Sequence, residues 1–348
     1  MLTFFARRLL AMVVTALCLT FVVFWLTNLA PNLEKIAKTE AGARITDAEV
    51  ESWLDKNGFG GPILLRYGEW LGVLPGWTQV EEDGTVRGRC LTEGVDPAAP
   101  PRFCGILQGD WGHSRVFRTE VIEVIGRGLA LTGKLMFWVM VVMVPGALLL
   151  GVLAGMREGS RTDRVLSTAA IATTATPEYV SGVVFIAVFT SSAVGLKWFN
   201  GSATSAMEDA TFVNFTLPVL TIALYGMGYI ARMTRASMAE VMTSQYIRTA
   251  RLKGVSFPQV VIRHALRNAL IAPFTVIMLQ VPWLLTGVVI VETLFNYKGF
   301  GWTLVEAAGN NDIELLLGVS VVSVIVVLVT QLISDVGYAV LNPRIRLS

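Results

Sequence analysis

The sequence is poor in charged residues, in cysteine and in histidine, and each shortage excludes a class of protein. Asp, Glu, Lys and Arg make up 16% of the 348 residues, whereas soluble globular chains carry about 25%. The charges lie in blocks between long apolar runs, which excludes a disordered chain and a soluble enzyme with one core. Three cysteines exclude a disulfide scaffold. His113 and His264 are the only histidines, and neither has a second ligand at useful spacing, so we expect no metal site.

The sequence also lacks a nucleotide-binding loop and a catalytic set of residues. Residues 128–134 read G-L-A-L-T-G-K and approach a phosphate loop, but Leu135 stands where a Ser or Thr would contact Mg²⁺. Clustered carboxylates and a nucleophile–base pair are equally absent from the sequence pattern. We therefore expect a chain that is not an enzyme and binds no cofactor.

Long apolar runs are what the sequence has in abundance. A membrane-crossing helix needs about 20 mostly apolar residues. The first run is longer than the core of a signal peptide, about 7–15 residues, so we expect it to be a retained helix. Gly151 and Gly155 form a G-x3-G pattern, which allows close helix packing. We predict an all-α integral membrane protein with six transmembrane helices, at 9–30, 135–156, 165–196, 210–231, 268–291 and 315–334.

The basic residues predict the orientation, because Lys and Arg collect in cytosolic connections. The connections on the side that holds both chain ends carry a net charge of +11, whereas residues 31–126 carry −5. This contrast predicts cytosolic termini and a large external segment between the first and second helices. The chain then divides into a first helix with its tip at 1–30, the external segment at 31–134 and a core of five helices at 135–348.

The external segment is too long to be a passive link between two spans. Thr46 followed by Glu49 is a capping-box pattern that predicts the start of a helix. Residues 62–74 have the apolar spacing of a second amphipathic helix. Residues 79–105 are rich in charged and turn residues, which indicates an insertion. We expect the two helices to pack on the membrane surface or on each other.

Two of the three cysteines, Cys90 and Cys104, belong to this insertion. Outside the cytosol an intrachain disulfide is the expected state of such a pair. The alternative is two free thiols in a mobile insertion. Cys18 lies in the first apolar run, where we expect it to be a packing residue.

The cytosolic connection at 232–267 has helical patterning. We expect a helix over 238–252, a break at Gly254, and a second helix that Ser256 caps, with Pro258 in its first turn. A helix–turn–helix of this kind presents a rigid knob below the membrane. The alternative is a charged loop that only sets topology, but a topology signal needs neither helical patterning nor a glycine hinge.

Charged residues inside membrane spans are costly, so they mark candidate functional positions. Glu178 follows Pro177, and it either faces a pathway or caps a broken helix. Glu292, at the outer end of the fifth span, is a second pathway candidate, although a role as anchor of the turn at 299–301 explains it better. Asp335 is expected to pair with a basic residue of the cytosolic side rather than to relay protons.

The cytosolic connection also carries a family likeness. It reads Y-I-R-T-A-R-L-K-G at 246–254 and R-H-A-L-R-N-A-L at 263–270. This resembles the membrane subunits of ATP-binding cassette (ABC) importers, most of all the dipeptide/oligopeptide permease type. The family pattern is E-A-A-x3-G. Ala250 and Gly254 match it, whereas Arg248 and Thr249 replace the first two residues, as is usual in the peptide branch.

The likeness covers nearly the whole chain, with two departures. Residues 30–33 read A-P-N-L where the family often has P-G-D-P, and the insertion at 79–105 is not part of the common pattern. Both departures bear on the substrate rather than on the family. The other matching stretches are F-A-R-R-L-L at 5–10, R-Y and W-L within 66–71, G-D-W-G-H-S at 109–114, T-P-E-Y at 176–179, V-E-T-L-F at 291–295, G-F-G at 299–301 and N-P-R at 342–344.

The resemblance implies a type I ABC importer transmembrane fold in the bacterial inner membrane, surrounded by lipid and without nucleic acid. The chain would form half of a translocation pathway beside a second, homologous permease. Two ATPase subunits, which hold ATP and Mg, would dock below, and a periplasmic solute-binding protein would deliver peptides or similar small solutes. The residues implied for coupling to the ATPase are Arg248, Ala250, Arg251, Lys253, Gly254, Arg263 and His264.

A stand-alone secondary transporter or channel is the main alternative. It predicts two related halves with matching broken helices, which the sequence does not display, and it gives no role to the helix–turn–helix. The cargo stays open at this point, because peptide permeases resemble those for nickel complexes, opines and some oligosaccharides.

Overall fold

A computed structural model describes residues 2–42, 44–80, 86–91, 100–192 and 196–341 of the chain. Within these ranges the side chains are described except at 2–5, 281–282, 285–287 and 338–341. Parts of the expected insertion at 79–105 and the C-terminal family match at 342–344 lie outside the described residues. The chain forms two compact units: a core unit of Met1–Arg8, Arg127–Thr303 and Val326–Ser348, and an N-terminal unit of Leu9–Gly126 and Leu304–Ile325.

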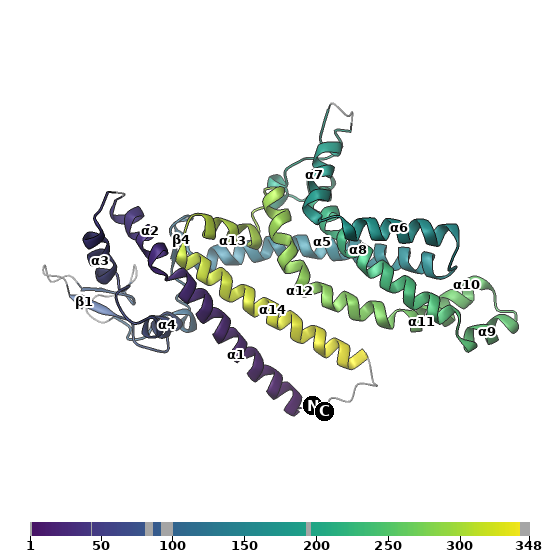
Figure 1. The fold of residues 1–348 in the computed structure, drawn as a ribbon, viewed down its shortest axis with the longest axis horizontal. Helices are drawn as coiled ribbons and strands as arrows, with labels where there is room; N and C mark the ends of the chain where they lie inside the picture. The colour runs from purple at the N-terminus through teal and green to yellow at the C-terminus, as the bar shows by residue number, and fades with distance from the viewer. Residues whose placement is uncertain (1, 43, 81–85, 92–99, 193–195, 342–348) are drawn as a thin grey trace. The chain divides into compact units, whose positions relative to one another are not determined.

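The N-terminal unit combines most of a long helix with short helices and two small hairpins (Figure 1). In the hairpins, β1 pairs with β2 and β3 pairs with β4, both antiparallel, with Val80 opposite Val86 and His113 opposite Glu120. Its elements are α1 (Leu2–Thr27), α2 (Ala30–Ala41), α3 (Asp47–Lys56), α4 (Ile63–Leu71), β1 (Thr78–Val80), β2 (Val86–Gly88), η1 (Ile106–Gln108), β3 (His113–Ser114), β4 (Thr119–Glu120) and the first turns of α14 (Ile313–Leu341).

Local sequence signals explain where the short helices of this unit begin and end. The Thr46 hydroxyl accepts the backbone N–H of Glu49, and the Glu49 carboxylate accepts the backbone N–H of Thr46 at 2.7 Å, so the predicted capping box is confirmed. Gly72 ends α4 with a φ of 84°, a conformation that glycine adopts at little cost. An apolar cluster then joins α1, α2, α4 and the start of α14 through Phe24, Leu33, Ile36, Trp70, Ile313 and Leu317.

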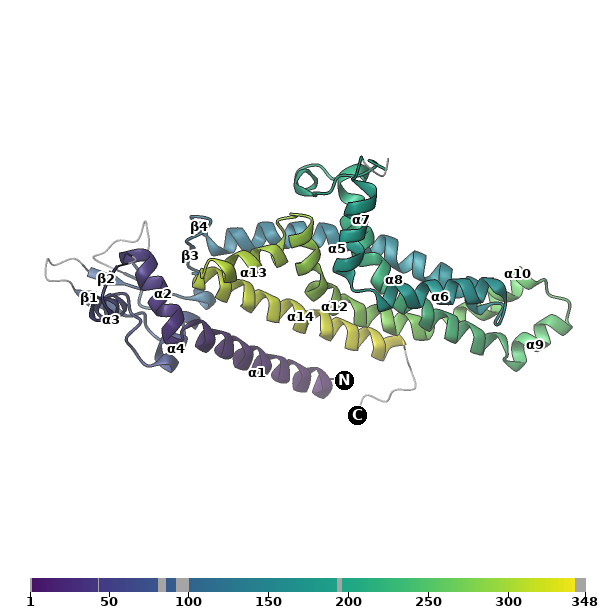
Figure 2. The ribbon, with the colours of Figure 1, turned by 45° about the horizontal axis from the view of Figure 1, so that its top comes forward.

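The described residues of the core unit form helices joined by short connections, and α5, α6 and α8 run alongside one another in both ribbon views (Figure 2). A chain of short helical pieces connects α8 to α12. The elements are most of α5 (Val121–Gly155), then α6 (Arg161–Ala175), α7 (Glu178–Phe189), η2 (Thr204–Met207), α8 (Phe212–Met242), α9 (Gln245–Leu252), α10 (Phe257–Gln259), η3 (Val260–Ala265), α11 (Leu266–Ala269), α12 (Ile271–Leu294), the first residues of α13 (Phe300–Gly309) and the rest of α14. The start of α5 and the rest of α13 belong to the N-terminal unit.

The predicted helical membrane protein is confirmed. In the described part of the chain α1, α5, α8 and α14 are long and apolar enough to cross a membrane. The number rises to six if each of two bent helix pairs counts as one span, namely α6 with α7 and residues 257–269 with 271–280. Several helices extend beyond the expected spans. Helix α5 begins at Val121 rather than at 135, and α8 continues to Met242 rather than ending at 231. An apolar run marks only the part of a helix that hydrocarbon accepts, whereas the helix itself continues to its capping residues.

The expected single span at 165–196 is wrong as a continuous helix. Two helices replace it, because α6 ends at Ala175 and α7 begins at Glu178, with a bend of 103° between them. Pro177 has no N–H to continue the helix, and the preceding Thr176 takes an extended conformation with ψ of 120°. In Figure 2, α7 accordingly stands across the direction of α6.

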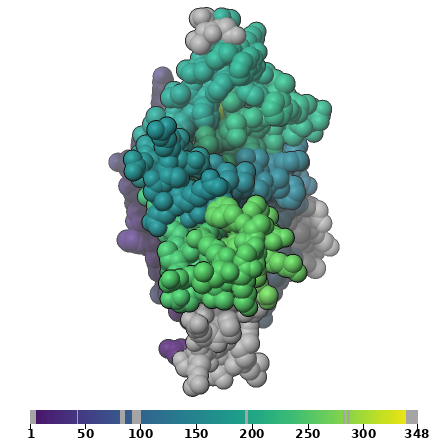
Figure 3. All heavy atoms as spheres, turned by 90° about the vertical axis from the view of Figure 1, so that its right-hand side faces the viewer, coloured from purple at the N-terminus to yellow at the C-terminus, as the bar shows by residue number. Residues whose placement is uncertain are grey.

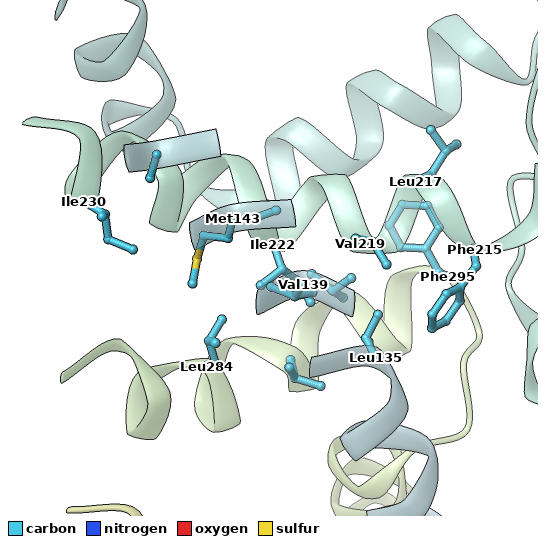
Figure 4. Packing of buried hydrophobic residues seen from close by; sticks show 14 of the residues in the cluster. Leu135, Val139, Met143, Phe215, Leu217, Val219, Ile222, Ile230, Leu284 and Phe295 are labelled. Carbon is cyan, nitrogen blue, oxygen red and sulfur yellow. The ribbon is translucent and has the colours of Figure 1, made fainter. Parts of the chain in front are cut away.

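The main hydrophobic core fills the space among α5, α8 and α12 (Figure 4). On α5, Leu135, Val139 and Met143 are fully buried and recur every four residues, so they form one stripe along the helix. Ile222 of α8 and Leu284 of α12 are also buried and complete the contact. The stripe, and not the overall apolarity of α5, decides which of its faces turns inward.

Small residues set how closely α5 approaches α8. A Cβ atom built on Gly151 would lie 2.6 Å from the carbonyl oxygen of Ala231, and one on Gly155 would lie 2.7 Å from Cβ of Met238. Both distances are shorter than a Cβ atom tolerates. The predicted packing role of the G-x3-G pattern is therefore confirmed.

We predict that Gly151→Val destabilises the folded chain by about 1–3 kcal/mol, because overpacking forces α5 away from α8. The matched control is Gly133→Val on the same helix, where a Cβ atom would meet nothing within 4 Å. Thermal unfolding of the purified chain in detergent measures both variants. A melting temperature of Gly151→Val equal to that of Gly133→Val would contradict the close approach of the two helices.

Candidate functional site

The connection between α8 and α12 folds into a compact structure, which we call the knob (residues 243–270). It contains α9, α10, η3 and α11, and it lies at the right-hand end of the core unit in Figures 1 and 2. In Figure 3, which looks onto this end, its green atoms lie toward the viewer. The expected helix over 238–252 is in fact two elements, because α8 ends at Met242 and Ser244 starts α9.

A hydrophobic core of its own holds the knob in shape. Met238 and Met242 at the end of α8 pack against Ile247 and Ala250 of α9. From the other side come Val260, Val261, Ala265 and Ala269, all buried. Because these residues recur at helical spacing on α9 and on η3, the two elements press against each other and against α8. The knob is thus a folded element with a hydrophobic core of its own rather than a loop without internal packing.

Two further features position α9. Asn268 donates a hydrogen bond of 2.9 Å to the hydroxyl of Tyr246, which ties α9 to the segment before α12. Gly254 has a φ of 77° and reverses the chain directly after α9. Residues other than glycine and asparagine rarely adopt this conformation. The expected break at Gly254 is therefore present, whereas its role as a hinge stays a prediction. Ser256 begins the second helical stretch as expected, although its side chain makes no capping hydrogen bond.

The coupling candidates divide between the surface and the inside of the knob. Arg248, Arg251, Lys253 and Arg263 are exposed, and so is Gly254. Ala250 is 8% exposed and belongs to the internal core, whereas His264 is half-buried. Of the four exposed basic residues, three lie on α9 or directly after it and Arg263 lies on η3, whereas Ala250 packs in the core of the knob.

Sequence reasoning missed the most exposed apolar residue of the knob, Leu252. Its exposed fraction is 82%, and it sits between Arg251 and Lys253 at the end of α9. A leucine on the charged face of a short amphipathic helix was the signal that could have revealed it. Leu252 therefore places one exposed apolar side chain between two exposed basic residues.

Sequence reasoning also missed a charged contact that fixes α6 against α8. The Arg235 guanidinium donates two hydrogen bonds of 2.8 Å to the Asp163 carboxylate, one to each oxygen. The side chain of Asp163 is only 3% exposed, and it also accepts the Gly159 N–H and the Ser167 hydroxyl. A bidentate pair with these further donors is rigid. It holds the base of α6 on the same stretch of α8 that enters the knob.

Glu292 lies in the anchoring position expected of it. Its carboxylate, fully buried, accepts the Thr132 hydroxyl and the Trp302 N–H, the latter at 2.9 Å. The Thr132 oxygen in turn accepts the Phe300 N–H at 2.8 Å. This network fastens the turn at 299–301 to α5. In this conformation the carboxylate faces protein groups, and its role in a pathway stays a prediction.

The remaining candidates have distinct surroundings. Glu178 is a half-buried residue in the first turn of α7, beside the 103° bend, where its charge suits the helix N-terminus. Asp335 forms an ion pair with Arg8, a residue of the basic N-terminal tip, as the expected pairing with a cytosolic-side basic residue requires. Cys90 and Cys104 form a disulfide with Cα atoms 5.4 Å apart. Cys18 is exposed on α1.

Apolar helices long enough to span a membrane, with the folded knob connecting α8 to α12, define a helical membrane protein. The chain belongs to the family of binding-protein-dependent transport system inner membrane components, whose model matches residues 147–347, more than half of the sequence. The match includes the knob and the helices that carry it. As a permease subunit of this kind, the chain is not itself catalytic.

Named relatives agree with this family over most or all of their length. The oligopeptide transport system permease protein AppB of Bacillus subtilis (strain 168) is 29% identical over 99% of this chain and 100% of its own. The dipeptide transport system permease protein DppB of Haemophilus influenzae is 32% identical over 69% of this chain and 78% of its own. The glutathione transport system permease protein GsiC of Pectobacterium atrosepticum is 28% identical over 99% of both chains.

A solved structure described as an amino acid ABC transporter with histidines covers 62% of this chain and 94% of its own chain. The TM-score is 0.48 and the sequence identity 15%. The family assignment rests on the sequence matches above.

We predict that Asp163→Asn destabilises the folded chain by about 1.5–3 kcal/mol, because the charged hydrogen bonds that Arg235 makes to this buried carboxylate are weakened. The matched control is Glu158→Gln. Its carboxylate lies 3.7 Å from Arg235, but its side chain is 58% exposed, so we expect a loss of about 0–1 kcal/mol. Thermal unfolding in detergent measures both variants. Equal losses would show that the Asp163 contact does not hold α6 on α8.

Proposed function

We propose that this chain is one of two related permease subunits of an ABC importer for peptides, with each permease forming half of the translocation pathway. Support for the peptide cargo comes from the relatives, which are named for oligopeptide, dipeptide and glutathione transport. A stand-alone transporter or channel is not favoured, because it offers no use for a knob with its own hydrophobic core.

We propose further that the knob couples the spans to ATP hydrolysis in partner subunits. One observation carries this proposal: the exposed Leu252 lies between the exposed Arg251 and Lys253, on a knob whose own hydrophobic core packs against the end of α8. A cleft that accepts Leu252 and has an acidic rim on each ATPase subunit would bind this shape and charge. Closure of the ATPase pair would then move α8 and α12 together, because the knob contacts both.

The proposed membrane arrangement follows the charge distribution. Both termini and the knob would lie in the cytosol, with residues 31–134 in the periplasm and six spans in the bacterial inner membrane. The two bent helix pairs would then each serve as one span. A periplasmic solute-binding protein would deliver the peptide to the outer side, and ATP with Mg would bind only to the partner subunits.

We predict that Gly254→Leu inserts and assembles normally but abolishes ATP-driven peptide uptake. A leucine at positive φ costs roughly 1–2 kcal/mol, so the turn would relax and shift α9 against its docking cleft. The control is Gly254→Asn, because asparagine tolerates this conformation and a Cβ atom here would meet nothing within 4 Å. Uptake of a labelled dipeptide into cells measures both. Full uptake by Gly254→Leu would refute a tight hinge at this point.

We predict that a cysteine at Lys56 reacts with a membrane-impermeant maleimide in intact cells, whereas a cysteine at Arg161 reacts only after permeabilisation. Both positions are exposed, and the background is Cys18→Ser. Lysed cells, in which both sites must react, provide the control. Labelling of Arg161→Cys alone in intact cells would invert the proposed topology.

A further inference from the structure

A cavity of about 900 Å³ lies inside the N-terminal unit. Its walls come from α4, from the segment after η1, from the strand segment that ends at Arg89, and from the first turn of α14. The volume falls within the range of about 300–1,000 Å³ typical of small-molecule sites. Every residue that lines it belongs to the described part of this unit.

Two guanidinium groups line this cavity, and neither forms an ion pair in the described part of the chain. Arg66 donates to the Phe59 carbonyl at 3.2 Å and to Asn28, and it lies 5.1 Å from the centre of the Phe59 ring. The position of the Arg66 guanidinium is thus fixed by neutral groups. Arg89 has a buried Nε without a hydrogen-bond partner. A buried donor left without an acceptor costs about 1–3 kcal/mol.

Two carboxylates line the same cavity. The Glu69 carboxylate accepts no hydrogen bond from the described residues, and burial raises the pKa of this carboxyl, although the nearby charges of Arg89 and Arg66 act in the opposite direction. Glu314 accepts the His113 N–H at 2.8 Å. Gly112, with φ of 79°, leaves the space that the Glu314 carboxylate fills. Neither carboxylate forms an ion pair in the described part of the chain, and only that of Glu314 is held by a hydrogen bond.

Charges of both signs thus face one cavity without pairing with each other. Opposite charges that are partly buried and kept apart lose solvation without gaining contact energy. A ligand that carries an ammonium group at one end and a carboxylate at the other would pair with both. The aromatic walls formed by Trp70 and Trp111 would bury its apolar part. The arrangement does not suit a simple anion or cation, because each would meet groups of its own sign.

We propose that this cavity binds a short peptide with free termini, with Arg89 and Arg66 facing the carboxylate and Glu69 and Glu314 facing the ammonium group. The identity of the ligand as a peptide rests on the proposed function, whereas the zwitterionic chemistry rests on the cavity alone. This would give the permease a peptide site of its own, in addition to the site in a solute-binding protein.

The test uses the full-length chain in detergent, without a solute-binding protein, and isothermal titration calorimetry with trialanine. The comparison ligands are N-acetyl-trialanine, which lacks the ammonium group, and trialanine amide, which lacks the carboxylate. We expect saturable binding of trialanine and a loss of about tenfold or more with either capped ligand, as a charged hydrogen bond is removed.

The variants assign the two ends of the ligand. Arg89→Gln should weaken trialanine about tenfold yet leave trialanine amide nearly unchanged, and Glu69→Gln should weaken trialanine and its amide but not the acetylated form. The control is Arg102→Gln, an exposed residue that does not line the cavity, and it should bind trialanine as the unaltered chain does.

Several outcomes would overturn the proposal. One is equal binding of free and capped ligands, and another is the absence of saturable trialanine binding to a chain that elutes as a single folded species. If peptide uptake in cells persists in that second case, the cavity site fails while the proposed transport function stands. If trialanine binds with the expected pattern but no peptide is transported, the cavity site stands while the proposed transport function fails.

Discussion

The close approach of neighbouring helices to α8 is the constraint on which the core unit depends. A backbone carbonyl of α8 lies where a side chain on Gly151 would begin, and the same holds between Gly228 of α8 and the Ala170 carbonyl of α6. In an apolar environment there is little hydrophobic gain from packing apolar helices together. Van der Waals contact at short range must therefore supply the energy that holds them together. Glycine and alanine at the crossing points provide that contact.

Polar groups then fix the direction and register that apolar packing alone leaves open. Asp163 and Arg235 join α6 to α8 in one bidentate geometry, and Glu292 joins the turn at 299–301 to Thr132 of α5. Each carboxylate has several donors, so its burial is compensated. These contacts also fix the position of the knob on α8. The α8 segment held by Arg235 continues directly into Met238 and Met242, which form part of the core of the knob.

The sequence predicted the local features well. The capping box at Thr46, the positive φ at Gly254, and the packing role of Gly151 all depend on residues a few positions apart, and each is present. The break at Pro177 was visible in the sequence, yet its effect was underestimated, since a proline in a span either kinks a helix slightly or ends it. Only the packing of α7 against α8 and α12 decides between these outcomes.

Long-range pairings could not be predicted in the same way. The need for a partner at Asp335 follows from the cost of a charge in a span, but periodicity does not select Arg8, which lies 327 residues away. The cavity is a stronger case, because Arg66, Arg89 and Glu314 come from three separate stretches of the chain. Taken singly, each is an ordinary charged residue. Their shared feature, a charge near its opposite but not paired with it, exists only once the N-terminal unit has folded. A site of this kind leaves no local pattern in the sequence, because it is defined by the spatial separation of charged side chains that come from distant parts of the chain.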